Sequence, residues 1–387
     1  MIKKQNICII GGSLSGLTTA ITLSKLNCNI DLITGNFNQN FDSSRTIAIS
    51  ESNLTFLKKL NIFKFPNKNF WPCSGFKLYE ENEYKKISEI FDMQDDLKQK
   101  KVFHMVKNSE LIKLLMQKIN NSNSISIKKH KINEIFTSGF LKGIKYKNQK
   151  YKYNLIIVCT GNDSKIVKNI FPNQFIENSY NETSIVTIIN HEKVKNNTAR
   201  QIFMNDEIFA LLPLSSSQTS IVWTIKNNKY TNDKLILKEK IKFYAKNFFK
   251  KITFDSKIEN KSLNFLIRNK YFEDRILLFG DSLHVVHPLT GQGFNMILRD
   301  LDSLVKKISN KLDLGLDIGS ENILSEFSLE TKPRNFAYSI GIDLIKNSFS
   351  IKNKFLGKLR NNVLKSVNKN NFAKKMIFNV ADKGLRF

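Results

Sequence analysis

The sixteen residues from Gly280 to Asn295 constrain the fold of this chain more than any other segment. They follow a short, largely apolar run, Arg275 to Phe279, of the kind that forms a strand buried in a parallel sheet. Gly280 allows the chain to turn sharply out of that strand, which places Asp281 at the carboxyl edge of the sheet. Because open α/β sheets bind ligands outside this edge, the sequence predicts a ligand site beside Asp281.

The second half of this segment opens a predicted amphipathic helix. Pro288 ends the loop, and the helix is expected to start near Gly291 to Gly293. The apolar residues that mark one helical face are Phe294, Ile297, Leu298, Leu301, Leu304, Val305 and Ile308. Glycines at this start let backbone N–H groups approach a flat ligand, and the helix dipole favours negative charge there, such as a reduced flavin ring carries. With Asp281 placed to accept hydrogen bonds from a ribitol chain, the segment predicts flavin binding; a capped tight loop is the alternative.

This motif resembles that of a known protein family. It is similar to the second FAD motif of the flavin-dependent aromatic monooxygenases, and within them to the ubiquinone-biosynthesis hydroxylases, the 2-polyprenylphenol and 2-octaprenyl-6-methoxyphenol hydroxylase group. The matching residues are Gly280, Asp281, His287, Pro288, Gly291, Gln292, Gly293, Asn295, Arg299 and Asp300. The resemblance implies an α/β protein with an FAD-binding Rossmann-like parallel-sheet domain, an inserted antiparallel-sheet substrate domain and C-terminal helices. It also implies FAD contacts from Asp281, Gly291, Gln292, Gly293 and Asn295.

The resemblance also implies a reaction. NAD(P)H reduces FAD, O₂ adds to give a flavin hydroperoxide, and its distal oxygen attacks an electron-rich phenol ring, while the protein supplies placement and excludes water. The loop at His287 and Pro288 would lie against the reacting face of the flavin as the catalytic element. His287 would deprotonate a ring hydroxyl, since an imidazole titrates near neutral pH. The alternative for His287 is a structural role in the loop, donating to the backbone.

A glycine-rich turn near the N-terminus supplies the other half of a nucleotide site. An apolar strand is predicted before this turn and a helix after it, with Gly11 to Gly16 between them. Gly11 makes the turn and Gly16 lets the helix pack closely, so that the FAD pyrophosphate would lie at the helix N-terminus beside Gly12. Ser13 replaces the middle glycine of the G-x-G-x-x-G pattern; its Cβ narrows the approach to the phosphate, and its hydroxyl can donate a hydrogen bond.

Three further positions complete the predicted cofactor site. Thr34 ends the second strand, where an acidic residue would hold the adenosine ribose, and offers a weaker contact. Arg45 opens a segment similar to the family's Arg-x-x-Ala-Leu-Ser, whose arginine lies near the flavin and the pyrophosphate; a solvated surface arginine is the alternative. Gly161 matches the glycine of the family's Ala-Asp-Gly-x-x-Ser motif, but Thr160 replaces its aspartate, with Asp163 as a candidate to compensate. That replacement leaves the choice of reductant open.

The chain of 387 residues is long enough for two domains. An FAD-binding domain is expected from 1–72, 101–175 and 265–330, and a substrate domain from 73–100 and 176–264. The predicted strands of the substrate domain's antiparallel sheet are Thr183 to Asn190, Phe209 to Leu214 and Thr219 to Lys226. Residues 331–387 form a basic, helical C-terminal section, and the active site is expected between the domains.

Cysteine usage and the chain start bear on location. The four cysteines lack metal-ligand spacing and are interpreted as reduced thiols, so no metal site is expected: they are Cys8, Cys28, Cys73 and Cys159. The N-terminal residues run straight into the first strand without room for a signal peptide, and no apolar run reaches the ~18 residues of a spanning helix. We expect a cytoplasmic protein, either soluble or attached peripherally to the inner face of the membrane.

The formal net charge of +27 is concentrated at the C-terminal end, although abundant Lys, Asn, Ile and Phe indicate that low-GC coding accounts for part of it. Residues 346–387 contain eleven Lys or Arg and one acidic residue. An apolar row with four-residue spacing runs through this section: Phe355, Leu359, Val363 and Val367. The pattern is typical of an amphipathic helix on an anionic membrane surface, and equally of a helix whose apolar stripe packs on the protein body. Nucleic-acid binding is not expected, because no recognised binding module is present.

The resulting hypothesis is an FAD-dependent monooxygenase that hydroxylates the aromatic ring of a polyprenyl phenol on the route to ubiquinone. Its expected cofactors are FAD and NAD(P)H, and its expected partners are the polyprenyl phenol, O₂ and other quinone-biosynthesis proteins. Two alternatives remain: an FAD-dependent reductase or dehydrogenase of a lipid substrate, and a non-catalytic accessory paralogue. The second is suggested by the altered positions Ser13, Thr34 and Thr160.

Overall fold

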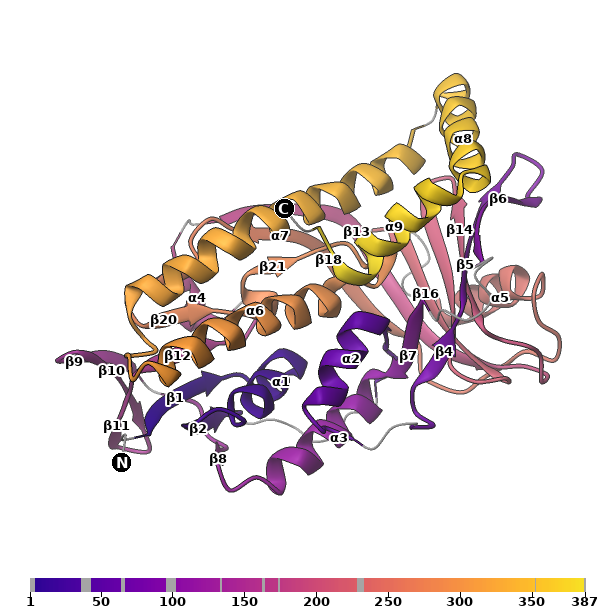
Figure 1. Cartoon of the computed structure of the whole chain (residues 1–387). Helices are drawn as coiled ribbons and strands as arrows, with labels where there is room; N and C mark the ends of the chain where they lie inside the picture. The colour runs from indigo at the N-terminus through magenta and orange to yellow at the C-terminus, as the bar shows by residue number, and fades with distance from the viewer. Residues whose placement is uncertain are drawn as a thin grey trace.

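The computed structural model describes residues 4–35, 43–63, 67–94, 102–132, 134–161, 164–172, 175–227, 233–351 and 353–385. Within these ranges the chain forms a parallel sheet with helices, a large second sheet, two small sheets and a group of C-terminal helices (Figure 1). The predicted α/β fold class is confirmed. Asp163, the candidate to compensate for Thr160, lies outside the described residues.

A six-stranded sheet carries the predicted nucleotide-binding strands. Its order is β19-β20-β12-β1-β2-β8, and neighbouring strands are parallel except for β19 and β20. The strands are β1 (Gln5–Ile10), β2 (Cys28–Ile33), β8 (Ile125–Lys128), β12 (Leu155–Val158), β19 (Phe272–Glu273) and β20 (Ile276–Leu278). The apolar residues of its central strands are buried, as expected for parallel strands covered by helices on both faces.

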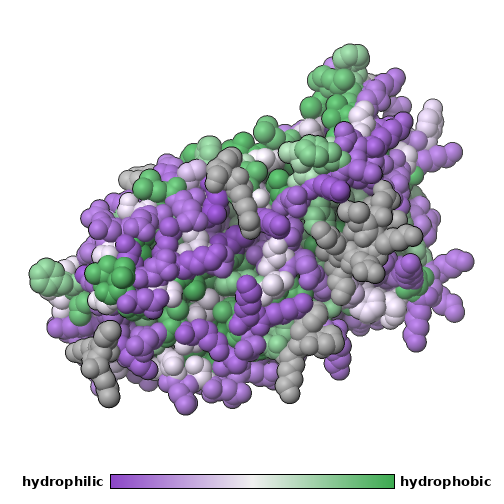
Figure 2. Space-filling model, viewed as in Figure 1, coloured by the Kyte–Doolittle hydropathy of each residue, from purple (hydrophilic) through white to green (hydrophobic). Residues whose placement is uncertain are grey.

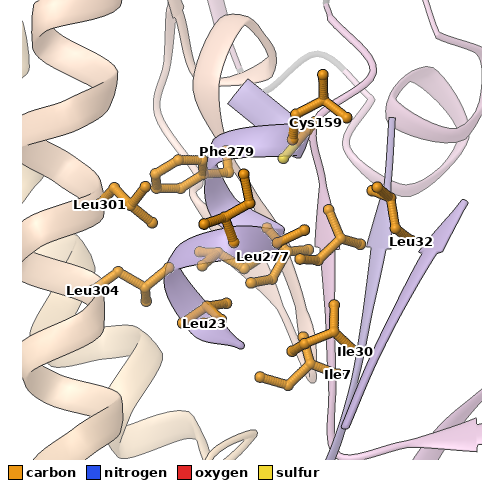
Figure 3. Close-up of a cluster of buried hydrophobic side chains, with 14 of the residues drawn as sticks. Ile7, Leu23, Ile30, Leu32, Cys159, Leu277, Phe279, Leu301 and Leu304 are labelled. Carbon is orange, nitrogen blue, oxygen red and sulfur yellow. The ribbon is translucent and has the colours of Figure 1, made fainter. Parts of the chain in front are cut away.

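Among the helices that share the hydrophobic core of this sheet are α1 (Leu14–Leu23), α3 (Asn108–Asn120) and α6 (Gly293–Asp313). The amphipathic helix predicted after Pro288 is confirmed as α6, which begins at Gly293. Its residues Leu301 and Leu304 have no exposed surface and lie beside Phe279 and Leu277 at the end of β20 (Figure 3). This packing fixes the N-terminus of α6 against the carboxyl edge of the sheet.

The large second sheet has nine strands in the order β21-β18-β13-β16-β15-β14-β5-β6, with β17 paired to β13. The pairs are antiparallel, except for β14 with β5. The strands are β5 (Gly75–Glu81), β6 (Ile87–Gln94), β13 (Phe175–Asn190), β14 (Thr198–Met204), β15 (Glu207–Pro213), β16 (Gln218–Lys226), β17 (Thr253–Phe254), β18 (Glu259–Arg268) and β21 (His284–Val285). The three strands predicted from sequence correspond to β13, β15 and β16. Helix α5 (Lys234–Ala245) shares a hydrophobic cluster with this sheet.

The large sheet and the parallel sheet are joined more closely than the expected domain limits imply. The limit expected at residue 264 falls inside β18, and β21 lies within the range 265–330. β21 follows the turn after β20 and pairs with β18, so the segment from β20 to β21 contributes one strand to each sheet. The loop after β21 is therefore held between the two sheets.

The remaining strands form two small three-stranded sheets. One has the order β3-β7-β4 and the other β11-β10-β9. Their strands are β3 (Thr46–Ser50), β4 (Trp71–Cys73), β7 (Phe103–Lys107), β9 (Glu134–Ser138), β10 (Leu141–Tyr146) and β11 (Gln149–Tyr153). Two further helices are α2 (Glu51–Lys59), directly after β3, and α4 (Lys165–Ile170).

The C-terminal section forms three helices, α7 (Glu321–Phe349), α8 (Lys354–Lys369) and α9 (Asn371–Lys383). α7 runs along the body, and α8 and α9 turn back toward α2 (Figure 1). The Asp382 carboxylate at the end of α9 accepts hydrogen bonds from the Ser52 N–H at 2.8 Å and the Ser52 hydroxyl at 2.6 Å. In the described part of the chain, no helix combines the length and the hydropathy needed to cross a membrane.

Candidate active site

The strands β1, β12 and β20 are neighbours in the parallel sheet, and a glycine follows the first of them. The Gly11 N–H donates a 2.8 Å hydrogen bond to the carbonyl oxygen of Ile33, and the residue has a φ of 128°. A Cβ on Gly11 would lie 2.5 Å from the carbonyl oxygen of Cys159, and a Cβ on Gly16 would lie 2.0 Å from that of Gly11. Both positions therefore require glycine, and together they let α1 start directly at the sheet edge.

Gly12 and Ser13 lie at the start of α1. Gly12 is buried, and Ser13 is the exposed N-cap residue. The Ser13 hydroxyl lies 3.0 Å from that of Ser15 and donates to the carbonyl oxygen of Cys159 at 3.3 Å, and it caps no N–H group of the first turn. The N-terminus of α1 therefore keeps backbone N–H groups for an anionic ligand, even though Ser13 replaces the expected glycine.

Asp281 lies in a single 3-10 turn, η1 (Gly280–Ser282), directly after the β20 region. Its carboxylate is exposed, and no protein partner is recorded for it within the described ranges. The neighbouring Ser282 hydroxyl accepts a 3.1 Å hydrogen bond from the Gly161 N–H and donates to the Gly161 carbonyl oxygen at 3.3 Å. Gly161 itself has a φ of 82°. Ser282, which the sequence did not single out, thus joins the segment that follows β12 to the turn carrying Asp281.

Thr34 and Arg45 lie at the ends of two other strands. Thr34 follows β2, and its N–H donates to the carbonyl oxygen of Lys128 at 3.0 Å. The nearby Asp31 carboxylate is used elsewhere, since it accepts from the Tyr153 hydroxyl at 2.6 Å and lies 3.6 Å from the Lys128 ammonium group. Arg45 precedes β3 and is exposed, with no side-chain partner recorded in the described part of the chain.

The loop between β21 and α6 contains a second 3-10 turn, η2 (Pro288–Thr290), followed by Gly291 with a φ of 61°. The Gly291 N–H donates to the Pro288 carbonyl oxygen at 3.0 Å. A Cβ on Gly291 would lie 3.3 Å from the Ala48 Cβ, whereas a Cβ on Gly293 would meet nothing within 4 Å. Gln292 is buried and accepts a 3.3 Å hydrogen bond from Arg299. The start of α6 thus faces Ala48 at Gly291 and open space at Gly293.

His287 is fully buried at the beginning of this loop. Its Nδ1 accepts a 3.0 Å hydrogen bond from the Leu289 N–H, and its Nε2 lies 3.1 Å from a carboxylate oxygen of Glu182. Burial lowers the pKa of the imidazole below its ordinary value, and this outweighs the opposing effect of Glu182. Because both ring nitrogens have protein partners, the geometry favours the structural alternative over a base that removes a proton from a substrate hydroxyl.

Asn295 is also fully buried, and the protein itself uses its side chain. Its Oδ1 accepts from the Ser50 N–H at 3.0 Å and from the Asn53 side chain at 2.9 Å, while its Nδ2 donates to the Ala48 carbonyl oxygen at 2.8 Å. These bonds join α6 to β3 and α2. We therefore infer that Asn295 positions the glycine loop and that direct contacts with a ligand fall to its neighbours.

Replacing Asn295 with alanine is expected to lower the free energy of unfolding by about 2–4 kcal/mol, because buried partners left unsatisfied each cost about 1–3 kcal/mol. Urea unfolding measures the change. Asn310→Ala, an exposed position on the same helix, is the matched control and should change stability by less than about 0.5 kcal/mol. Equal stability of the two variants would contradict the role given to Asn295.

Three features of this sheet edge fit an FAD molecule. The hydroxyls of Thr46 and Thr160 are buried without a hydrogen-bond partner in the described structure. Such groups are costly unless a ligand or water satisfies them. A Cβ on Gly161 or Gly293 would meet open space, so a flat group has room beside that backbone. The uncapped start of α1 suits a pyrophosphate.

A separate cavity of about 930 Å³ lies between α2, α6 and α7. Helices α2, α6 and α7 and the C-terminal residues line it, including Arg299, Arg334 and Glu330. None of the predicted cofactor residues is among its lining residues. This cavity is therefore distinct from the glycine-rich edge of the sheet.

Comparison with known proteins identifies the family of this chain. The model of the FAD binding domain family matches residues 4–334. The chain belongs to this family. The mitochondrial ubiquinone biosynthesis monooxygenase COQ6 of Dictyostelium discoideum is 23% identical, and the match covers 98% of this chain and 92% of that protein. The 3-demethoxyubiquinol 3-hydroxylase of Escherichia coli is 23% identical, with 90% of each chain covered.

The fold of this family member also matches solved structures. The p-nitrophenol 4-monooxygenase PnpA from Pseudomonas putida superposes with a TM-score of 0.80 over 100% of both chains, at 14% sequence identity. At this identity the likeness establishes the fold. The family match and the monooxygenase relatives identify the chain as an FAD-dependent monooxygenase.

Proposed function

We propose that this FAD-dependent monooxygenase hydroxylates the aromatic ring of a polyprenyl phenol in ubiquinone biosynthesis, using NAD(P)H and O₂. The observation that carries the proposal is the intact loop from Asp281 to Gly293, held between the two sheets and starting α6 beside open space. Two relatives that match over at least nine-tenths of both chains are named for ubiquinone biosynthesis and demethoxyubiquinol hydroxylation.

In this proposal the chain's own groups hold and orient the cofactor. The N–H groups at the start of α1 would bind the pyrophosphate, and Arg45 would neutralise part of its charge. The Asp281 carboxylate would accept hydrogen bonds from the ribitol chain, and the N-terminus of α6 would stabilise negative charge on the ring. When bound, FAD supplies the electron transfer and O₂ activation that ring hydroxylation needs.

An apolar region borders the glycine loop and suits an aromatic ring with an isoprene tail. Ala48, the residue facing Gly291, belongs to an apolar cluster with Cys73, Val102, Phe103, Met105 and Ala199. Leu289 of the loop belongs to a second cluster, which includes Phe91, Met93 and Phe203 of the large sheet. Phe378 of α9 packs against both clusters. A ring bound beside these clusters would have apolar side chains around it in place of water.

The proposed function is tested with purified protein, FAD, NAD(P)H and a short-chain prenyl phenol. Addition of the phenol should accelerate NAD(P)H oxidation, and mass spectrometry should detect a hydroxylated product. A flavin-containing protein that oxidises NAD(P)H at the same rate with and without the phenol, and forms no product, would overturn the assignment.

We further propose that α8 and α9 dock on an anionic membrane surface, which would bring the site to a substrate held by its tail. The predicted apolar row divides: Phe355, Leu359 and Val363 are 73%, 53% and 55% exposed, whereas Val367 packs against the large sheet's cluster. α9 adds Phe372, which is 72% exposed. Figure 2 shows hydrophobic residues gathered over α8. Lysines flank these residues, a composition that suits anionic lipid.

The double variant Phe355→Ser/Phe372→Ser should bind vesicles of phosphatidylglycerol at least about tenfold more weakly, because burial of each phenyl ring contributes about 1.5–3 kcal/mol. Vesicle co-sedimentation measures the effect. Phe140→Ser is the control, since this side chain is 91% exposed at the other end of the molecule, in the turn between β9 and β10. Equal vesicle binding by wild type, the double variant and Phe140→Ser would refute docking through α8 and α9.

A further inference from the structure

A buried group of charged side chains lies next to the glycine loop, outside the residues assigned to cofactor or substrate. The Glu182 carboxylate on β13 lies 3.1 Å from His287 Nε2 and 2.9 Å from the ammonium group of Lys346 on α7. Glu182 and Lys346 are 9% and 7% exposed. Tyr180 and Asp343 complete the group: the Tyr180 hydroxyl donates to Asp343, and Lys346 lies 4.4 Å from the centre of the Tyr180 ring.

This arrangement determines which groups carry charge. Burial by itself raises the pKa of the Glu182 carboxyl, but hydrogen bonds from His287 and Lys346 outweigh it and lower the pKa overall. The Leu289 N–H points at His287 Nδ1, so Nδ1 must be an unprotonated acceptor and Nε2 must carry the hydrogen given to Glu182. One buried carboxylate is thus balanced by one cation, Lys346, and the imidazole stays neutral.

We propose that Lys346 and Glu182 are positioning residues for the flavin loop, acting by keeping His287 in its neutral, Nε2-protonated form. His287 Nδ1 accepts the first N–H of the turn η2, and that turn leads directly into Gly291 and the start of α6. A second proton on the imidazole would place two N–H groups face to face and break this bond. The inference rests on the proposed placement of FAD against Gly291 to Gly293.

Without the Lys346 charge, the His287 imidazole would become the group that balances the Glu182 carboxylate, by taking up a proton. Burial lowers the pKa of His287 in wild type and in Lys346→Met alike, and the Glu182 carboxylate opposes it; the variant removes the lowering effect of the Lys346 charge, so the pKa of His287 rises relative to wild type. The other titratable groups facing the imidazole are Tyr180, whose pKa is raised by burial, and Asp343. His287 should then take up a proton more readily than in wild type as the pH falls through the range in which imidazoles titrate.

The experiment measures the dissociation constant of FAD against pH by quenching of flavin fluorescence. For Lys346→Met we expect a rise of at least about tenfold from pH 8 to pH 6, because one proton taken up over two pH units changes affinity by up to about a hundredfold. Wild type should show a flat profile. Lys332→Met is the matched control on α7, with no ion pair recorded in the described structure, and it should follow wild type. If the FAD dissociation constant of Lys346→Met changed with pH no more than that of wild type and Lys332→Met, the proposal would be overturned.

Two further measurements separate this role from a general loss of structure. Adding His287→Asn to Lys346→Met should remove the pH dependence, because the amide oxygen accepts the Leu289 N–H and does not titrate in this range. In wild type, nitrogen NMR of the five imidazoles should show His287 neutral and protonated on Nε2 throughout. Titration of His287 in wild type would also overturn the proposal.

If Lys346→Met does not fold, Glu182→Gln/Lys346→Met removes both buried charges and keeps an oxygen for His287 Nε2. This variant should bind FAD with a flat pH profile, and a sloping profile would contradict the proposal. These readouts use FAD binding and NMR alone. A negative result here would therefore contradict the role of Lys346 and Glu182 without contradicting the proposed hydroxylation, which substrate turnover tests separately.

Discussion

Gly11→Ala is expected to abolish stable FAD binding and to lower the free energy of unfolding by about 2–6 kcal/mol. A φ of 128° costs a residue with a Cβ about 1–3 kcal/mol, and a Cβ placed 2.5 Å from the Cys159 carbonyl oxygen adds about 1–3 kcal/mol through displaced backbone. The displacement separates β1 and β12 at the point where the pyrophosphate is proposed to bind. Urea unfolding and the flavin absorbance retained after gel filtration measure the two effects.

The control for this variant is Gly357→Ala in α8, where an added Cβ meets nothing within 4 Å. An alanine in a helix interior is favoured over glycine by about 0.8–1.0 kcal/mol, so this change should stabilise the protein slightly and leave FAD bound. A Gly11→Ala protein that purifies with a full complement of flavin would show that the turn after β1 does not form the pyrophosphate site.

Asp281→Ala is expected to weaken FAD binding by about ten- to a hundredfold while leaving the flavin-free protein as stable as wild type. The carboxylate is exposed and has no recorded protein partner in the described structure, so its removal breaks no internal contact. A hydrogen bond to a charged group contributes about 1.5–3 kcal/mol, and about 1.4 kcal/mol corresponds to a factor of ten in affinity. Fluorescence titration with FAD measures the loss.

Two variants calibrate that result. Asp281→Asn keeps one acceptor oxygen without the charge and should fall between wild type and Asp281→Ala. Asp313→Ala makes the same charge change at the C-terminal end of α6, the opposite end from the glycine loop, and should bind FAD normally. Weakening by Asp313→Ala equal to that by Asp281→Ala would mean that net charge, and not a ribitol contact, governs affinity.

The elements of the fold that carry the proposed cofactor site could be predicted because their signals are local. A glycine-rich turn between an apolar strand and a helix specifies a strand-turn-helix unit, and the apolar spacing after Pro288 specifies α6 with its start at Gly293. In each case the neighbouring residues in the sequence are also the neighbours in space. The antiparallel strands β13 and β16 were predictable for a related reason, since each carries a long β-branched run.

The contacts of His287 with Glu182 and of Asn295 with Ser50 could not be predicted, because these partners are distant in the sequence. His287 meets Glu182, which is 105 positions away, and Asn295 meets Ser50, which is 245 positions away. Periodicity indicates which face of an element is buried, but it does not identify the residue opposite. The apolar row of α8 illustrates the same limit: its spacing is regular, yet Val367 packs on the protein and Phe355 is exposed.

The most direct test of ring hydroxylation by this monooxygenase is turnover of a prenyl phenol under isotopically labelled dioxygen. We expect one labelled oxygen atom in the new ring hydroxyl of each product molecule, with one NAD(P)H consumed for each. Substrate oxidised without incorporation of the label would contradict monooxygenation and indicate a reductase or dehydrogenase.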